Sequence, residues 1–153
     1  MNKLTRLEKC EIAISRGYTY NEETGFIYSG KHNKRVIRKS HGYISINFMV
    51  NGKSYNLLGH QFAWYFMHKE IVEEIDHKNG IKSDNRRINL RSVTRVQNTF
   101  NLTSAKGYSL NKNNRFHSSI KLNNKTIYLG TFDTDIEARN AYLEAKKIYH
   151  KID

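Results

Sequence analysis

Asp76 and His77 stand side by side in the segment IDHKNGIKSDNRRINLRSVTRVQN, with Asn89 and Asn98 further along it. A carboxylate offers a hard oxygen ligand to a divalent ion, and a neighbouring imidazole can accept a proton near neutral pH. With one metal ion, these two groups are the smallest set that can support hydrolysis of a phosphodiester. The pair therefore predicts a metal-dependent nuclease site.

Each residue of this segment has an expected role. Asp76 and Asn98 supply oxygen ligands to Mg²⁺ (or Mn²⁺), while substrate phosphate and water complete the coordination shell. Neutral His77 takes a proton from the attacking water. Asn89 holds His77 in its productive orientation, by a hydrogen bond within the loop or to the imidazole. Asn85 is an alternative to Asn89, although its place in a polar loop favours a turn.

The other histidines are expected to play lesser parts. His60 opens an apolar segment, so a structural role is favoured for it, in contact with DNA or with the helix of the motif. His32, His41 and His68 are predicted at the solvated surface.

The segment must be positioned by elements on both sides of it. A charged opening stretch with apolar residues at helical spacing predicts a short helix ending by Gly17. Short β-prone runs follow from Tyr18 to Leu58, and the step Asn51-Gly52 predicts a tight hairpin turn between two of them. Residues 60–68, HQFAWYFMH, are apolar at helical spacing and predict a buried helix.

Around the candidate site we expect a strand, a long polar loop, a second strand and a helix. The second strand is predicted over 88–93, and Thr94 is a plausible N-cap for the helix that carries Asn98. This order can bring Asp76, His77 and Asn98 together around one ion.

Residues 101–107, NLTSAKG, have linker composition and precede a second pattern. Two alternating runs and a helix opened by the capping box Thr134 to Glu137 predict a small three-stranded antiparallel sheet packed on one helix. The expected class is α+β. The predicted domains are 1–103, with the strand-loop-strand-helix motif at about 70–103, and 104–153.

Charge and cysteine content narrow the functional classes. The net charge of +12 favours a polyanionic partner, although a basic protein that is merely soluble would show it too, and charge does not separate DNA from RNA. The single Cys10 excludes an internal disulfide and a zinc site of paired thiolates, which suits a reducing cytosol. With no secretion signal or apolar run of membrane-spanning length, we expect a cytoplasmic protein that does not enter membranes.

The segment around Asp76 resembles the HNH endonucleases, whose ββα-metal motif places a His after the first strand, a central Asn, and a His or Asn on the helix. Asn89 follows His77 by 12 residues and Asn98 follows Asp76 by 22, as in the phage and intron-encoded homing branch. The resemblance covers roughly 40–103. Asn98 stands where many members have His, which favours magnesium or manganese over zinc. The paired CxxC staples of the family are absent.

The C-terminal pattern is similar to the DNA-binding domain of plant ethylene-response (APETALA-type) factors, which also accompanies phage HNH endonucleases. The matching residues are Gly107-Tyr108, Phe116, Leu129-Gly130-Thr131-Phe132, Glu137-Ala138 and Ala141-Tyr142. That family lays its sheet in the major groove. The resemblance therefore implies a DNA-reading sheet, while the early arginine of the plant pattern is missing, so the base sequence read does not transfer.

The pattern as a whole predicts a homing-type, metal-dependent DNA endonuclease, encoded by a phage or mobile element, that nicks double-stranded DNA as a monomer without an obligatory protein partner. If it is phage-encoded, its place is the cytoplasm of the host cell. The alternative is a catalytically inactive DNA-binding regulator with an HNH fold, and an RNA-directed protein is a weaker third possibility. The expected DNA contacts are Lys78, Lys82, Arg86, Arg87, Arg91, Arg95, Lys112, Arg115, His117, Ser119, Lys121, Thr126 and Tyr128.

Overall fold

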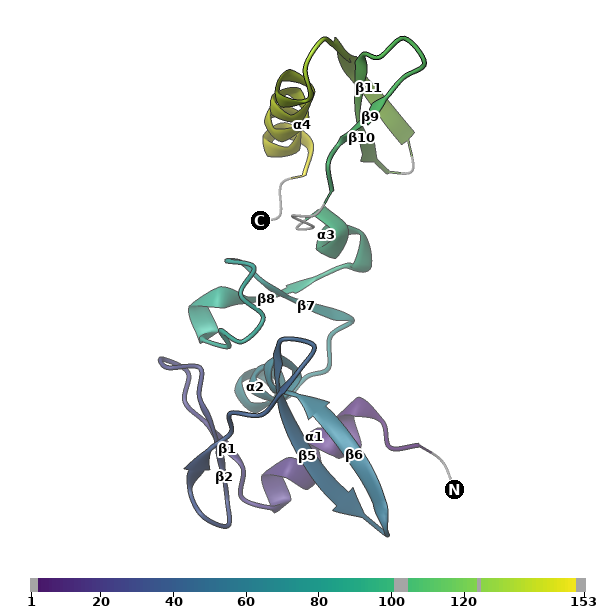
Figure 1. Ribbon diagram of the computed structural model, residues 1–153. Helices are drawn as coiled ribbons and strands as arrows, with labels where there is room; N and C mark the ends of the chain where they lie inside the picture. Colours follow the sequence, from purple (N-terminus) through teal and green to yellow (C-terminus); the bar gives the residue numbers. More distant parts are fainter. Residues whose placement is uncertain (1–2, 101–104, 124, 151–153) are drawn as a thin grey trace. The chain divides into compact units, whose positions relative to one another are not determined.

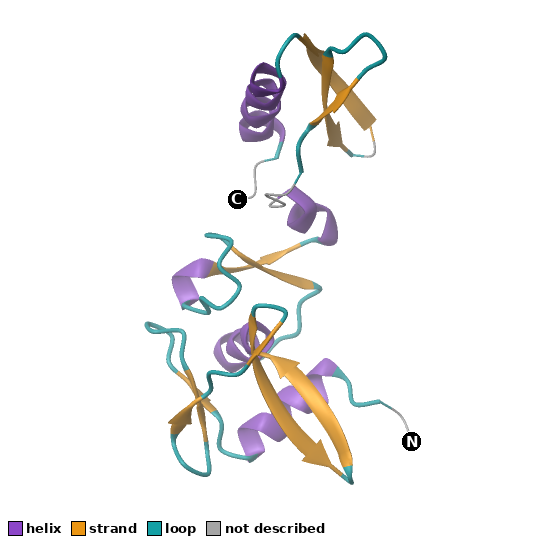
Figure 2. Ribbon diagram, in the orientation of Figure 1, coloured by secondary structure: helices purple, strands orange, loops and turns teal. Residues whose placement is uncertain are grey.

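The computed structural model describes residues 3–100, 105–123 and 125–150 (Figure 1). It divides into two compact units, Met1–Thr94 and Arg95–Asp153. The domain boundary predicted between residues 103 and 104 lies outside the described residues. The chain is α+β, with helices and small antiparallel sheets, as the sequence predicts (Figure 2).

The first unit opens with helix α1, Arg6–Ser15. Its start is fixed by a capping box, in which Thr5 accepts from the Glu8 backbone amide while the Glu8 side chain accepts from Thr5. The guanidinium of Arg6 donates to the Val72 carbonyl at 2.6 Å, which ties α1 to the chain just before the candidate site.

Two small sheets follow α1. Strands β1 (Thr19–Tyr20), β2 (Ile27–Ser29) and β3 (Lys34–Arg35) form the first, and β4 (Lys39–Ser40), β5 (Tyr43–Val50) and β6 (Lys53–Leu58) form the second. The turn predicted between β5 and β6 is present. Asn51 and Gly52 both have positive φ, 48° and 76°, which is the geometry that a tight two-residue hairpin requires.

Helix α2, Gly59–His68, confirms the helix predicted over 60–68. Phe62 and Ala63 are fully buried in it, and they pack with residues of α1, β2, β5 and β6 into one core. The most buried members of this core are Cys10, Ala13, Ile27, Ile46, Leu57, Phe62 and Ala63. The core thus fixes α2 and the sheets beside the hairpin that follows them.

This hairpin consists of β7 (Glu74–His77) and β8 (Leu90–Val93). The second strand starts two residues later than predicted, because residues 87–89 form the short 3₁₀ helix η1, Arg87–Asn89. The amides of Asn89 and Leu90 both donate to the Arg86 carbonyl, and this turn takes the place of strand pairing.

The second unit contains α3 (Arg95–Phe100), strands β9 (Tyr108–Leu110), β10 (Phe116–Leu122) and β11 (Lys125–Phe132), and helix α4 (Asp135–Tyr149). The sheet order is β11-β10-β9, and the capping box at Thr134 is present, as predicted. Ile120, Tyr142 and Ala145 form the small core between the sheet and α4. No helix in the described ranges is long and apolar enough to cross a bilayer.

Candidate active site

The β7–β8 hairpin positions the two residues on which the nuclease prediction rests. Asp76 is paired with Arg91 and His77 with Leu90 across the antiparallel ladder. Both polar side chains are buried, with 7% of Asp76 and 5% of His77 exposed. Burial of a carboxylate and an imidazole is costly unless each has a partner, so the partners define what this site can do.

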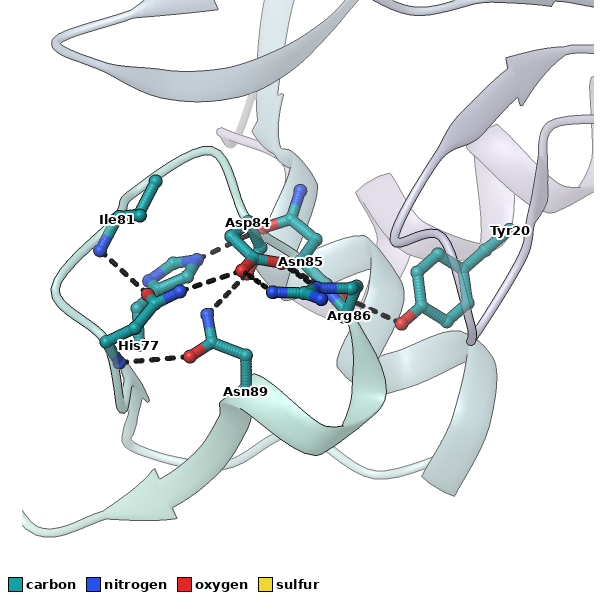
Figure 3. Close-up of polar contacts among 8 residues, drawn as sticks. Tyr20, His77, Ile81, Asp84, Asn85, Arg86 and Asn89 are labelled. Carbon is teal, nitrogen blue, oxygen red and sulfur yellow. Dashed lines mark hydrogen bonds and ion pairs between the residues drawn. The ribbon is translucent and has the colours of Figure 1, made fainter.

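Asn89 closes the loop that joins the two strands. Its Oδ1 accepts from the Asn79 amide at 3.0 Å, and its Nδ2 donates to the Asp84 carbonyl at 2.7 Å (Figure 3). Of the two ways in which Asn89 was expected to orient His77, the structure contains the hydrogen bonds within the loop. The imidazole has another partner.

That partner is Asn85, the residue for which the sequence favoured a turn. His77 Nε2 and Asn85 Oδ1 are 3.1 Å apart and buried, on facing sides of the loop (Figure 3). An amide oxygen can only accept, so Nε2 carries the proton and donates. The ring nitrogen left to accept a proton is therefore Nδ1.

The electrostatics favour a neutral imidazole. Burial lowers the pKa of His77 below its ordinary value, while the hydrogen bond to Asn85 and the charge of Asp76 act in the opposite direction. Because the net direction is downward, His77 is uncharged at neutral pH. An uncharged imidazole is the form that can act as a general base.

His60, from the first turn of α2, lies against His77. The ring centroids are 5.2 Å apart, and Tyr43 packs on His60 at 4.9 Å and on His77 at 5.9 Å. Burial lowers the pKa of His60 to about 3, so it is neutral, and within the described part of the chain its buried Nδ1 has no hydrogen-bond partner. His60 thus packs against His77 at one side of the site, and only 7% of its surface is exposed for contact with DNA.

The loop itself is braced by charge. Arg86 donates to both carboxylate oxygens of Asp84, at 2.8 and 2.6 Å, and Asn79 donates to Asp84 at 2.8 Å. These bonds, with Arg86 first, lower the pKa of Asp84 to about 2. Sequence reasoning assigned Arg86 to phosphate, whereas here it also stabilises the loop.

Asp76, next to His77 in the chain, is the carboxylate predicted to hold a cation at the site. Its Oδ2 accepts from Arg91 at 2.9 and 2.8 Å, so Arg91 fixes the rotamer of the proposed ligand. Asn98 lies on α3, in the second unit, and its proximity to Asp76 stays a prediction. Within the described ranges, no three His, Cys, Asp or Glu side chains gather as a metal cage.

Lysines and arginines make up most of the residues expected to contact DNA. Lys78, Lys82, Arg95, Lys112 and Lys121 are exposed. Lys82 also lies over the Tyr43 ring, at 5.0 Å from its centroid. Four of the arginines form ion pairs with carboxylates, and these pairs are Arg86 with Asp84, Arg87 with Glu22, Arg91 with Asp76, and Arg115 with Asp133.

The predicted reading face lies on β10 and β11 of the second unit. The register pairs His117 with Thr131, Ser119 with Tyr128, and Lys121 with Thr126, which sets these side chains on one face. A register shift between Ser118 and Ser119 breaks strict alternation. On this face the rings of His117 and Tyr128 lie 4.8 Å apart, and the hydroxyl groups of Tyr128 and Thr131 are 2.8 Å apart.

Comparison with known proteins bears on the segment that contains the candidate site. Residues 58–100 match the family model of the HNH endonucleases. This range contains Asp76, His77 and Asn98, so the resemblance of this segment to the HNH endonucleases, which the sequence predicts, is confirmed. No curated protein matches the chain.

A solved structure described as "DNA binding and cleavage by the HNH homing endonuclease I-HmuI" is similar to this chain at 31% sequence identity. The similarity covers 57% of this chain and 52% of that one, with a TM-score of 0.46. This chain thus spans about half the length of that protein.

Proposed function

We propose that this chain is a metal-dependent DNA endonuclease of the homing HNH type that nicks duplex DNA. The observation that carries the proposal is the buried His77 beside Asp76, with Nε2 donating to Asn85 and Nδ1 left to accept a proton. It lies inside the segment that matches the HNH endonucleases. A fixed, neutral imidazole next to a carboxylate is what hydrolysis of a phosphodiester by one metal ion requires.

In this proposal the residues of the chain divide the work. Asp76, held by Arg91, and Asn98 on α3 provide a carboxylate and an amide oxygen, a hard donor set that fits Mg²⁺ or Mn²⁺. A bound ion would supply charge stabilisation at the phosphate and the leaving oxygen. His77 would accept the proton of the attacking water at Nδ1.

The second unit is proposed to position the enzyme on its target. The face that carries His117, Ser119, Lys121, Thr126 and Tyr128 is polar and basic, and its opposite side packs on α4. Two-stranded and three-stranded sheets of this kind can enter the major groove. The similarity of this unit to the ethylene-response-factor domain supports the same role, with Lys112 and Arg115 as flanking contacts.

The basic residues of the first unit are proposed to contact the DNA backbone. Contacts to phosphate fix the register of a protein on DNA, whereas contacts to bases select the sequence. Lys78, Lys82 and Arg95 are assigned to this role, as are Arg87 and Arg91 in addition to their ion pairs. One catalytic centre per monomer implies a nick in one strand.

The test incubates supercoiled plasmid containing a selected binding site with the protein, with and without magnesium. We expect conversion to the open circle that requires magnesium and is lost in His77→Ala and Asn98→Ala, with DNA binding retained in His77→Ala. The matched control is His68→Ala, an exposed histidine at the end of α2. No nicking by the intact protein on DNA that it binds would favour the catalytically inactive regulator instead.

A further inference from the structure

Asn85 is the most deeply buried polar side chain of the loop, with 1% of its surface exposed. It forms hydrogen bonds both with His77, at the start of the loop, and with Tyr20, in the N-terminal part of the chain. Its Oδ1 accepts from His77 Nε2 at 3.1 Å, and its backbone carbonyl accepts from the Tyr20 hydroxyl at 2.7 Å (Figure 3). Tyr20 ends β1, 65 residues earlier in the chain.

Two glycines bring other segments against Asn85. A Cβ built on Gly25, which has a φ of +70°, would lie 2.5 Å from the Arg86 nitrogen and 2.7 Å from the Asn85 carbonyl carbon. A Cβ on Gly59, the first residue of α2, would lie 2.8 Å from Asn85 Nδ2. A side chain at Gly25 would displace Asn85 and Arg86, and one at Gly59 would displace Asn85 and Ile44.

A third contact joins the same two segments. The Arg87 amide donates to the Glu22 carbonyl at 3.0 Å, and the Arg87 guanidinium pairs with the Glu22 carboxylate at 3.0 Å. Residues 20–25 therefore hold the loop at Asn85 and at the two residues that follow it. These residues lie outside the range that matches the HNH family.

The amide nitrogen of Asn85 is buried and has no hydrogen-bond partner among the residues that the structure describes. An unsatisfied buried donor costs about 1–3 kcal/mol of stability. What asparagine provides here is an amide oxygen that accepts from His77 without adding a charge.

We propose that Asn85 is a positioning residue for His77, and that the β1–β2 segment, through Tyr20 and Gly25, fixes it. The amide oxygen holds the imidazole with its proton on Nε2, which aims Nδ1 at the reacting water. This inference rests on the proposed function of His77 as the base. It assigns to the N-terminal segment a part in catalysis that the matched segment alone does not contain.

The first test reads the imidazole directly. Ring ¹⁵N spectra of the full chain at neutral pH, with the His77 signals identified by their loss in His77→Ala, should show protonated Nε2 and unprotonated Nδ1. Asn85→Ala should mix the two tautomers, and Asn85→Asp, which retains an acceptor oxygen, should restore Nε2–H. A proton on Nδ1 of His77 in the intact protein would overturn the proposal, whether or not the protein nicks DNA.

The second test separates positioning from folding. Well below the melting temperature of each variant, Asn85→Ala should lower the nicking rate at saturating protein by about 100-fold. The DNA affinity of this variant should stay within about twofold of that of the intact protein, since Asn85 is buried and is not among the residues proposed to contact the DNA backbone. Tyr20→Phe should lower the nicking rate by about tenfold or less, the worth of one hydrogen bond.

A double variant with Asn85→Ala and Tyr20→Phe shows whether the two residues act through each other or independently. The double variant should be no slower than Asn85→Ala alone, because Tyr20 is proposed to act through Asn85. Tyr18→Phe removes a hydroxyl from the same segment and should nick at the normal rate. Additive losses, or a normal rate in Asn85→Ala, would contradict the proposal, while loss of nicking in His77→Ala would show that the proposed function still holds.

Discussion

The β7–β8 loop of the first unit and the β10–β11 face of the second unit carry similar residue types in opposite settings. His77 is 5% exposed and has a defined partner on its ring. His117 is exposed on a sheet surface, where it stacks on Tyr128. A buried, fixed group suits proton transfer, whereas an exposed group suits contact with a large partner. The same side chain therefore predicts an effect on rate in one unit and on affinity in the other.

The strongest test of this contrast replaces each of the two histidines with alanine. His77→Ala should lower the nicking rate by about 100-fold or more, since a positioned base contributes at least that much. His117→Ala should instead weaken binding by about tenfold or less and leave the rate at saturating protein unchanged. Single-turnover nicking and binding titrations measure the two effects. Equal loss of rate in both variants would remove the distinction between the units.

A glycine substitution tests whether the two units fold independently. A Cβ on Gly107, which has a φ of +76°, would lie 2.0 Å from the Tyr142 ring. Gly107→Ala should destabilise the second unit by about 3 kcal/mol or more, since neither the backbone nor the ring can give way cheaply. Heteronuclear NMR should show the second unit lost and the His77 signals unchanged. A change at His77 would show that the units depend on each other.

The pH dependence of stability should also differ between the units. Burial lowers the pKa of folded His60 from 6.5 to about 3, so below pH 6.5 the unfolded chain binds a proton that the native state does not. Stability from this group is complete above pH 6.5 and is lost as the pH falls towards 3, by on the order of 5 kcal/mol. Urea unfolding at several pH values should show a flatter profile in His60→Phe. An identical profile would mean that His60 is not buried in its neutral form.

The smallest expected effects concern the basic residues of the loop. Lys78→Ala and Lys82→Ala should each weaken DNA binding and reduce the salt dependence of log K by about one. Arg86→Ala should change the salt dependence less, because Arg86 already neutralises Asp84 at 2.6 Å. Binding measured at several salt concentrations distinguishes them. If Arg86→Ala reduced the slope of log K against log salt concentration by a full unit, the Arg86–Asp84 ion pair would have to break when DNA binds.

Features set by neighbouring residues could be predicted from the sequence. The Asn51-Gly52 turn, the helix at residues 60–68 and the capping box at Thr134 all depend on residues within one turn of each other. The position of the adjacent residues Asp76 and His77 at the end of a strand could also be predicted from the residues around them.

Features set by residues far apart in the sequence could not be predicted. The 3₁₀ turn at Arg87–Asn89 and the choice of Asn85 over Asn89 as partner of His77 depend on Tyr20, Gly25 and Gly59. Nothing in the local pattern KSDNRRIN marks Asn85 as the buried residue. A polar loop that contains Asn next to Arg is typical of a surface turn, and only the packed tertiary structure reverses that expectation.

The buried hydrogen bond between His77 and Asn85 has a consequence for protein engineering. Selection for heat resistance alone would favour variants that replace both residues by apolar ones, because a change at Asn85 alone would leave the Nε2 proton of His77 buried without its acceptor. We expect such a screen to accumulate apolar residues at positions 77 and 85 together and to yield robust proteins that still bind DNA and no longer cut it. A thermostable nuclease from this scaffold would have to gain its stability elsewhere and keep asparagine at this position.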